Sequence, residues 1–323
     1  MTLNTRRPTG KPSWPITLIA GAEKAGKSWA CAQASASDLI GRTLWIGIGE
    51  DDPDEYGVIP GADFEIVEHD GTYRGILAAI TAAQQEPQSD LPTLIVVDSM
   101  TRLWQLISGD MQARANDRAK AKAEKYRKPI PAEDVQITMD LWNVARDQWE
   151  AVVDVLRAHQ GPVLVTARLE EVTVMDSAGK PTTEKEFKVQ AHKSLPYDVG
   201  AIVELPQRGQ AFLRGVKSAH LQLEERVRFP KFDVDTLWRR LGLADVEIGE
   251  RRHATARGEQ HAAPAGNPDL ARDWIAEGQQ ATTGEQLAAL YEDAKAAGAD
   301  LRRGSDLWTF FGQRMSDLRA EAA

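Results

Sequence analysis

Residues 21–28 read Gly-Ala-Glu-Lys-Ala-Gly-Lys-Ser, and this stretch decides the fold that we predict. It matches G-x-x-x-x-G-K-[ST], the Walker A phosphate-binding loop. Its glycines allow a sharp turn in which successive main-chain N–H groups face anionic oxygens. Lys27 is expected to reach the β- and γ-phosphates, and the Ser28 hydroxyl to bind Mg²⁺. An apolar, strand-like run precedes the loop and a helical pattern follows it, so the stretch predicts a nucleotide site at a helix N-terminus.

The loop is followed by three more apolar runs that alternate with helical patterns. Residues 43–48, 94–98 and 162–166 read as buried strands, and 94–98 lacks alternation, as a central parallel strand does. Alternating strands and helices predict an α/β fold with a doubly wound, mostly parallel sheet and ligands at the strands' C-terminal ends. Residues 199–216 read as a terminal antiparallel hairpin, and 170–196 as a long loop or flexible hairpin.

Length and composition limit the class of protein to which the chain can belong. The chain has 323 residues, enough for one large α/β domain and a small appendage, with a formal charge of −9 that argues against a uniformly basic nucleic-acid binder. The lone cysteine, Cys31, has no partner for an intrachain disulfide. The N-terminus has no signal-peptide pattern, and no apolar run approaches about 18 residues. We therefore expect a cytoplasmic protein without membrane contact.

A composition shift near residue 246 separates the large domain from the rest. Residues 249–268 lack apolar periodicity, whereas three short amphipathic segments follow at 268–278, 283–297 and 304–320. The predicted divisions are a flexible tail (1–13), the α/β core (14–245), a linker (246–267) and a three-helix module (268–323).

Two carboxylates follow predicted strands. Asp98 ends the apolar run 94–98 and is the Walker B candidate for Mg²⁺. Glu50 follows the strand 43–48 and is the candidate base for the attacking water, with Asp51 as the second choice. The alternative for Glu50 is a solvated acidic turn, because other carboxylates crowd the same place.

Together, the phosphate loop, Glu50 with its acidic-Pro-Tyr turn, and the run IVVDS at 95–99 resemble the RecA-like ATPase core over roughly residues 14–230. The pattern is most similar to compact RecA-core ATPases of bacteriophages that promote single-strand annealing or recombination. The resemblance implies ATP held between subunits of a filament or ring. It also implies that Glu50 is the catalytic glutamate. Tyr56 resembles the family's adenine-stacking tyrosine, although its spacing from Glu50 is shorter, and core packing is the alternative.

The same resemblance suggests further contacts to the nucleotide. Thr166 or Arg168 stands where the family has a polar sensor of the γ-phosphate, without the glutamine that RecA uses. Lys217, and then Arg214, resemble the basic residue presented to the neighbouring subunit's ATP; a solvated strand cation is the alternative. The residues that we expect to contact the nucleotide are Gly21, Ala22, Glu23, Lys24, Ala25, Gly26, Lys27, Ser28, Trp29, Tyr56 and Thr166.

Two regions occupy the positions of the family's DNA-binding loops. Residues 112–128 hold seven cations against two carboxylates, together with Tyr126 as a possible stacking side chain. The second region is 170–196. A solvated helix whose lysines only confer solubility is the alternative reading. The candidate DNA-binding residues are Arg114, Arg118, Lys120, Lys122, Lys125, Arg127, Lys128, Lys185, Lys188 and Lys193.

The sequence thus predicts an ATP- and Mg²⁺-dependent ATPase that forms a homo-oligomer, binds single-stranded DNA and assists annealing or strand exchange. A helicase, helicase loader or motor on the same core is a second hypothesis. A third is a KaiC-like nucleotide-dependent switch or scaffold without DNA binding. The C-terminal module is a candidate docking site for a protein partner.

Overall fold

The structure is a computed structural model that describes residues 3, 5–87, 89–176, 179–244, 246–252, 274–296, 301 and 306–321. The chain divides into two compact units, Met1–Ala254 and Thr255–Ala323. Most of the predicted linker, residues 253–267, lies outside the described residues, as do residues 1, 2 and 4 of the predicted tail.

The first unit is built on one large sheet. Its hydrogen-bonded order is β3-β2-β4-β5-β1-β7-β8-β9, and β6 pairs with β5. The strands from β3 to β7 in this order run parallel, whereas β6, β8 and β9 are antiparallel to their neighbours. This confirms the predicted mostly parallel α/β fold. The strand bounds are β1 Ile16–Gly21, β2 Arg42–Gly47, β3 Glu65–Ile66, β4 Thr93–Asp98, β5 Val163–Met175, β6 Pro181–Gln190, β7 Ala201–Gln207, β8 Gln210–Val216 and β9 Val227–Arg228.

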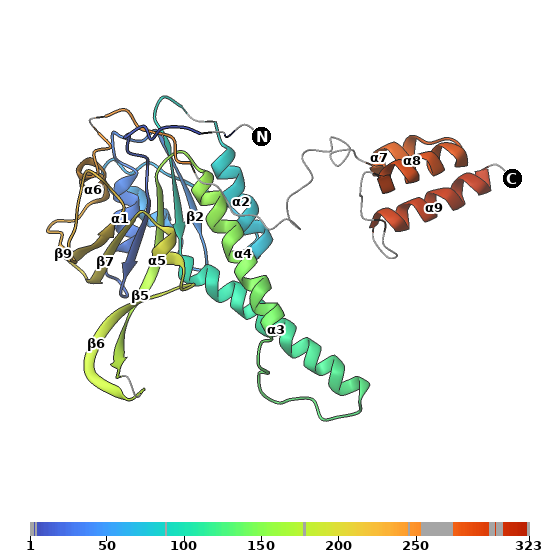
Figure 1. The fold of residues 1–323 in the computed structure, drawn as a ribbon, viewed down its shortest axis with the longest axis horizontal. Coiled ribbons are helices and arrows are strands. Elements are labelled where there is room, and N and C mark those ends of the chain that lie inside the picture. Colours follow the sequence, from blue (N-terminus) through green and yellow to red (C-terminus); the bar gives the residue numbers. More distant parts are fainter. Residues whose placement is uncertain are drawn as a thin grey trace. The chain divides into compact units, whose positions relative to one another are not determined.

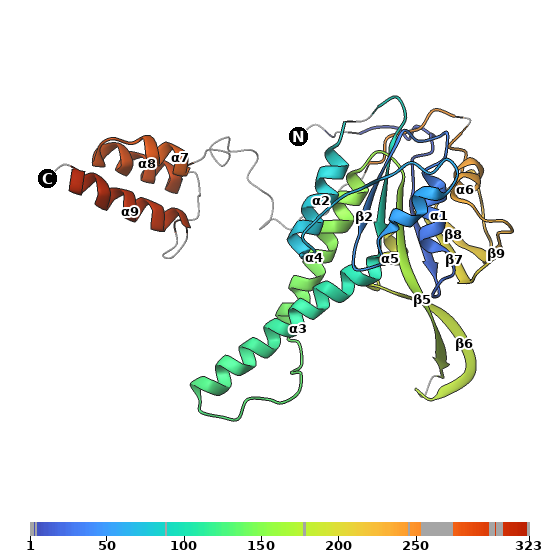
Figure 2. The ribbon, with the colours of Figure 1, turned by 180° about the vertical axis from the view of Figure 1, so that it is seen from behind.

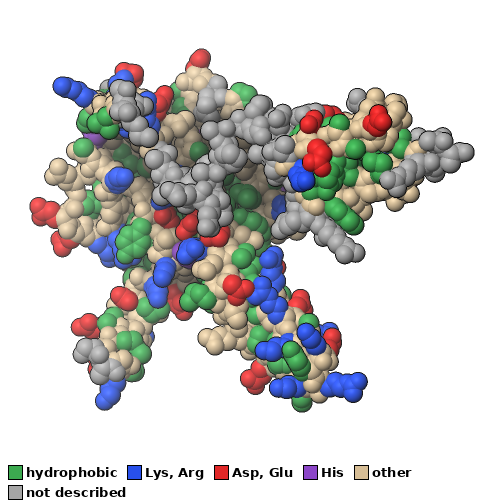
Figure 3. Space-filling view, turned by 45° about the vertical axis from the view of Figure 1, so that its right-hand side comes forward, with side chains coloured by type: hydrophobic (Ala, Val, Ile, Leu, Met, Phe, Trp, Pro, Cys, Tyr) green, Lys and Arg blue, Asp and Glu red, His purple; other side chains and the backbone are tan. Residues whose placement is uncertain are grey.

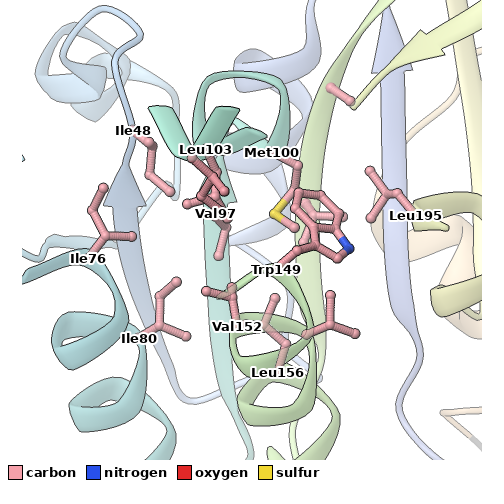
Figure 4. Close-up of a cluster of buried hydrophobic side chains, with 14 of the residues drawn as sticks. Ile48, Ile76, Ile80, Val97, Met100, Leu103, Trp149, Val152, Leu156 and Leu195 are labelled. Carbon is pink, nitrogen blue, oxygen red and sulfur yellow. The ribbon is translucent and has the colours of Figure 1, made fainter. Parts of the chain in front are cut away.

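Helices cover both faces of this sheet because alternate strand residues are apolar on each side. In β1, Leu18 belongs to one buried cluster and Ile19 to the other. The first cluster lies under α2 (Tyr73–Gln85), α3 (Met100–Lys125) and α4 (Met139–Ala158), where Trp149 fills the space between α4 and the sheet (Figure 4). The second lies under α1 (Lys27–Ala34), the short 3₁₀ helix η1 (Pro53–Val58) and α6 (Val234–Arg240).

Strand register brings the predicted motifs to one edge. Gly21 at the end of β1 lies opposite Arg168 of β5 and Leu205 of β7, and Gly47 at the end of β2 lies opposite Asp98 of β4. The loops that leave these parallel strands therefore meet at the C-terminal edge, where α/β sheets bind ligands.

Two elements project from the first unit (Figures 1 and 2). The C-terminal half of α3 extends beyond the sheet, and residues 126–138 return from its end to Met139, where α4 begins. We call residues 112–138 the helical arm. The second projection is the β5–β6 hairpin, which accounts for most of the predicted long loop, and the short helix α5 (Leu195–Asp198) follows it.

The second unit contains α7 (Trp274–Gln280), α8 (Gly284–Ala296) and α9 (Asp306–Glu321), which confirms the predicted C-terminal helical module. Trp274, Leu287, Phe311 and Leu318 form its buried cluster. Within the described residues, no helix combines the length and the apolarity that a membrane crossing requires.

A buried histidine predicts how stability depends on pH. His159 follows α4, lies fully buried, and has Nε2 2.7 Å from the Thr93 carbonyl oxygen, whereas Nδ1 has no hydrogen-bond partner among the described residues. Burial lowers the pKa of His159 to about 4, and the Arg251 charge adds to this. Between about pH 4 and pH 6.5 the unfolded chain therefore binds up to one more proton than the folded chain. We expect the free energy of unfolding to fall by on the order of 3 kcal/mol from pH 7 to pH 4 through this group alone.

Urea denaturation at several pH values measures this effect. A His159→Gln variant cannot titrate, so its stability should lose this part of the pH dependence, whereas His220→Gln, at an exposed position, should keep it. An unchanged pH profile in the His159→Gln variant would contradict the assignment.

Candidate nucleotide-binding site

The phosphate loop has a backbone that requires glycine at both ends. Gly26 has φ of 102°, a left-handed conformation that side chains disfavour. A Cβ added to Gly21 would lie 2.9 Å from Lys27 Cγ and 3.1 Å from Leu205 Cβ. The Ala22 N–H donates to the Leu205 carbonyl at 3.0 Å, which fixes the start of the loop to β7. The loop thus forms a fixed turn at the N-terminus of α1, where a phosphate group fits.

Lys27 lies over this turn. Its ammonium donates to the carbonyl oxygens of Gly21 at 3.2 Å and Ala22 at 3.1 Å. Burial lowers the pKa of Lys27 from its ordinary value, and the charges of Asp98 and Glu50 oppose that shift. The ammonium is therefore positioned at the mouth of the loop, close to two carboxylates.

Asp98 accepts hydrogen bonds from two hydroxyls. Ser28 Oγ, on α1, donates to Oδ2 at 2.6 Å, and Thr166 Oγ1, on β5, donates to Oδ1. The side chain is buried, and this burial raises the pKa of Asp98 against the effect of both hydrogen bonds. The geometry joins the end of β4 to the first turn of α1, as a shared metal site would require.

The hydroxyl and carboxylate oxygens here suit Mg²⁺. This ion commonly takes one or two protein oxygens and completes its octahedron with phosphate and water oxygens. The described residues contain no group of three or more His, Cys, Asp or Glu side chains able to hold a metal by themselves. Ser28 and Asp98 therefore fit an ion that arrives with a polyphosphate.

Glu50 is held from three directions at the same edge. Its Oε1 accepts from Ser99 Oγ at 2.7 Å, and the Arg168 guanidinium contacts both carboxylate oxygens at 3.1 Å. Arg102 Nε lies 3.9 Å away. Burial raises the pKa of Glu50, but the bonds from Arg168 and Ser99 outweigh it, so the pKa lies below its usual value. The carboxylate is thus ionised at neutral pH.

Lys27, Ser28, Glu50 and Arg168 line a cleft of about 970 Å³, whereas Asp98 and Thr166 are not part of its lining. Lys27, Glu50 and Arg168 share it with the loop residues Glu23, Lys24 and Ala25 and with the first residues of α1. Its size suits a nucleotide, since small-molecule sites range from about 300 to 1,000 Å³. Ala22 does not line this cleft but a second, smaller cavity beside Phe187 and Phe212.

Tyr56 and Trp29 form an aromatic part of the cleft wall. Their rings meet edge to face with centroids 6.2 Å apart, and Trp29 is 45% exposed. Tyr56 also packs partly against the cluster under α1. Base stacking and core packing, the two roles considered for Tyr56, are both compatible with this position.

The two predicted strand cations are not in this cleft. Lys217 lies after β8, where its N–H donates to the Gly200 carbonyl at 2.7 Å, and Gly200 in turn bonds to Ile16 at the start of β1. This is the edge of the sheet opposite the phosphate loop. Arg214 pairs at 3.1 Å with the buried Glu204. A role for either residue at a neighbouring subunit's nucleotide stays a prediction.

Two cations that the sequence analysis did not single out line the cleft. They are Arg208, in the turn between β7 and β8, and Lys231. Among the described residues Arg208 forms no ion pair. The sequence motifs gave no signal for either residue, because their position depends on β7 pairing in parallel with β1. That pairing sends the β7–β8 turn to the loop edge.

Cations of the helical arm fall into two groups. Arg114 pairs with Asp110 at 2.8 Å and Arg118 with Asp140 at 2.6 Å. The remaining arm cations form no ion pair with any described residue: Lys120, Lys122, Lys125, Arg127 and Lys128. Lys125 Nζ lies 5.6 Å from the centre of the exposed Tyr126 ring. Figure 3 shows Lys and Arg side chains gathered on the lower right projection, which is the arm.

The β5–β6 hairpin is not a basic surface. Lys188 lies across from Glu170, and Lys185 Nζ donates to Thr173 Oγ1 at 3.0 Å. Residues 170–190 carry five carboxylates against three lysines. Lys193 lies beyond the hairpin at an exposed position. The arm therefore fits a polyanion better than the hairpin does.

No protein-family model and no curated protein matches the chain. Among solved structures, the crystal structure of the RadB recombinase is 17% identical with a TM-score of 0.38, over 69% of this chain and 90% of that chain. A structure described as a prototypical ATPase from the type III secretion system of pathogenic bacteria is 14% identical with a TM-score of 0.33, over 59% of this chain and 50% of that chain. Likeness at this level carries no information on activity.

Proposed function

We propose that the first unit is a magnesium-dependent ATP hydrolase. One observation carries this proposal: the hydroxyls of Ser28 and Thr166 converge on Asp98, while Ser28, Lys27 and the ionised Glu50 line one cleft. This arrangement supports the proposal because a phosphate-binding turn, a pair of residues for Mg²⁺ and a base would then act together. Phosphoryl transfer needs these parts and little covalent chemistry from the protein.

Each residue has a defined task in this proposal. The main-chain N–H groups of the loop bind the phosphates, and Lys27 transfers its hydrogen bonds from the Gly21 and Ala22 carbonyls to phosphate oxygens. Ser28 and Asp98 would hold Mg²⁺, which would supply positive charge to neutralise the phosphates. Glu50 orients the attacking water and accepts its proton.

We propose that this hydrolase forms a homo-oligomer. We also propose that its helical arm binds single-stranded DNA. Five arm cations that form no ion pair within the described part of the chain can contact phosphates, and the 58% exposed Tyr126 ring offers a surface for base stacking. A role in annealing or strand exchange rests on the resemblance of the sequence to phage RecA-core ATPases. No described feature favours base-specific recognition.

ATP hydrolysis with and without single-stranded DNA tests the proposal, and Lys27→Ala tests its site. Loss of charge-assisted hydrogen bonds to phosphate should weaken ATP binding by about tenfold or more. Lys11→Ala is the matched control, because Lys11 pairs with Glu247 outside the cleft. Equal ATP affinity in the Lys27→Ala and wild-type proteins would contradict the assignment, and turnover that is indifferent to DNA would remove the DNA-dependent role.

A further inference from the structure

The Glu50 carboxylate is bound by a guanidinium at both of its oxygens. Arg168 Nη2 lies 3.1 Å from Oε1 and 3.1 Å from Oε2, and Nε lies 3.3 Å from Oε1. An opposite charge this close stabilises the ionised carboxylate and makes it a poorer proton acceptor. Glu50 is therefore held in place but restrained as a base in this arrangement.

Arg168 itself has a fixed backbone and a reachable side chain. Its N–H donates at 2.9 Å to Thr101 Oγ1, which in turn donates to the Gln190 carbonyl, so β5, α3 and β6 are joined at this point. The side chain is 38% exposed. The backbone can thus stay in place while the guanidinium exchanges one anionic partner for another.

The second anion would come from the nucleotide. Arg168 lies opposite Gly21 in the sheet register, at the first residue of the phosphate loop, and both residues line the cleft. Its charge acts on Lys27, because it contributes to lowering the pKa of that ammonium. A terminal phosphate held by Lys27 would therefore lie within the field of the same guanidinium.

We infer that Arg168 is a positioning residue whose guanidinium is shared between Glu50 and the terminal phosphate of a bound nucleoside triphosphate. This rests on the proposed function. In the absence of that phosphate the guanidinium restrains Glu50. When the phosphate takes the guanidinium, the carboxylate keeps its bond from Ser99 and becomes the stronger base. ADP lacks the terminal phosphate and leaves the ion pair intact.

Equilibrium binding distinguishes this exchange from a structural role. We would measure the affinities of ADP and of a non-hydrolysable ATP analogue, both with Mg²⁺, for the full chain. In Arg168→Gln the analogue should bind about tenfold more weakly, because a charged hydrogen bond to phosphate is lost. The affinity for ADP should stay within about twofold of the wild-type value, because ADP lacks the phosphate that Arg168 would contact.

The reciprocal variant should change the affinity for the ATP analogue in the opposite direction. Glu50→Gln removes the competitor for the guanidinium, so the analogue should bind more tightly than in the wild type, with ADP again unchanged. In the double variant this gain in affinity should vanish. A double-mutant cycle would then show energetic coupling between Glu50 and Arg168. Arg157→Gln is the matched control, because Arg157 pairs with Asp198 at 2.7 Å outside the cleft.

The outcomes separate the inference from the function on which it rests. Equal weakening of ADP and analogue in Arg168→Gln, or an unchanged ratio in Glu50→Gln, would overturn the inference and leave the ATPase proposal intact. A chain that binds neither nucleotide would overturn both.

Discussion

Glu50→Gln is expected to lower the turnover number for ATP by about 10²–10⁴-fold, the usual contribution of a positioned general base. The variant should still bind ATP, because Lys27 and the Ser28–Asp98 pair make their hydrogen bonds to groups other than Glu50. Glutamine keeps the size of the side chain and can still accept from Ser99 Oγ. The loss should therefore appear in the turnover number rather than in the affinity for ATP.

Steady-state hydrolysis combined with nucleotide titration measures both quantities. Asp51→Asn is the matched control, since Asp51 is the next carboxylate of the same acidic turn, lines the same cleft and is exposed. Near-normal turnover in Glu50→Gln would remove Glu50 as the base. An equal loss in Asp51→Asn would assign the effect to the charge of the whole turn.

The sequence predicts the fold class and the core of the site because those depend on local patterns. A glycine-rich loop between a strand and a helix, and an apolar run that ends in Asp98, are readable without knowledge of strand order. The observed sheet confirms the doubly wound, mostly parallel topology. That topology also explains why Glu50, Asp98 and Lys27 meet, since parallel strands end at one edge.

Other parts of the site depend on pairings that the sequence does not reveal. Arg208 reaches the cleft, and Lys217 lies at the far edge, because the predicted β7–β8 hairpin joins the sheet through the parallel pairing of β7 with β1. Glu204 sits inside an apolar strand pattern, so its ion pairs with Arg214 and Arg226 could not be predicted from that pattern. Each case requires contacts between residues distant in sequence, for which propensity and periodicity carry no signal.

Net charge and pairing both distinguish the two projections. Carboxylates outnumber the lysines of the β5–β6 hairpin in the sequence, and the strand register also brings Lys188 opposite Glu170. The arm cations beyond residue 118 form no ion pair among the described residues. The lysines of the two predicted DNA-binding regions therefore have to be weighed against the carboxylates near them.

Replacing the five unpaired arm cations by glutamine is expected to weaken binding of single-stranded DNA roughly a thousandfold at about 0.1 M salt. Each phosphate contact to a single strand contributes about 0.7 to the slope of log affinity against log salt, so five lost contacts should reduce that slope by about 3.5. Glutamine and lysine have similar helix propensities, so α3 should persist. Fluorescence anisotropy of a labelled oligonucleotide across a salt series measures both effects.

The hairpin supplies the matched control for this experiment. Replacing Lys180, Lys185 and Lys188 by glutamine removes three cations from a segment that already carries five carboxylates. If the arm is the DNA-binding surface, this variant should keep a salt slope close to that of the wild type, and the arm variant should retain ATP hydrolysis without DNA. Equal slopes in the arm variant and the wild type would instead show that the arm lysines are only solvated, because counterion release counts the phosphates actually contacted.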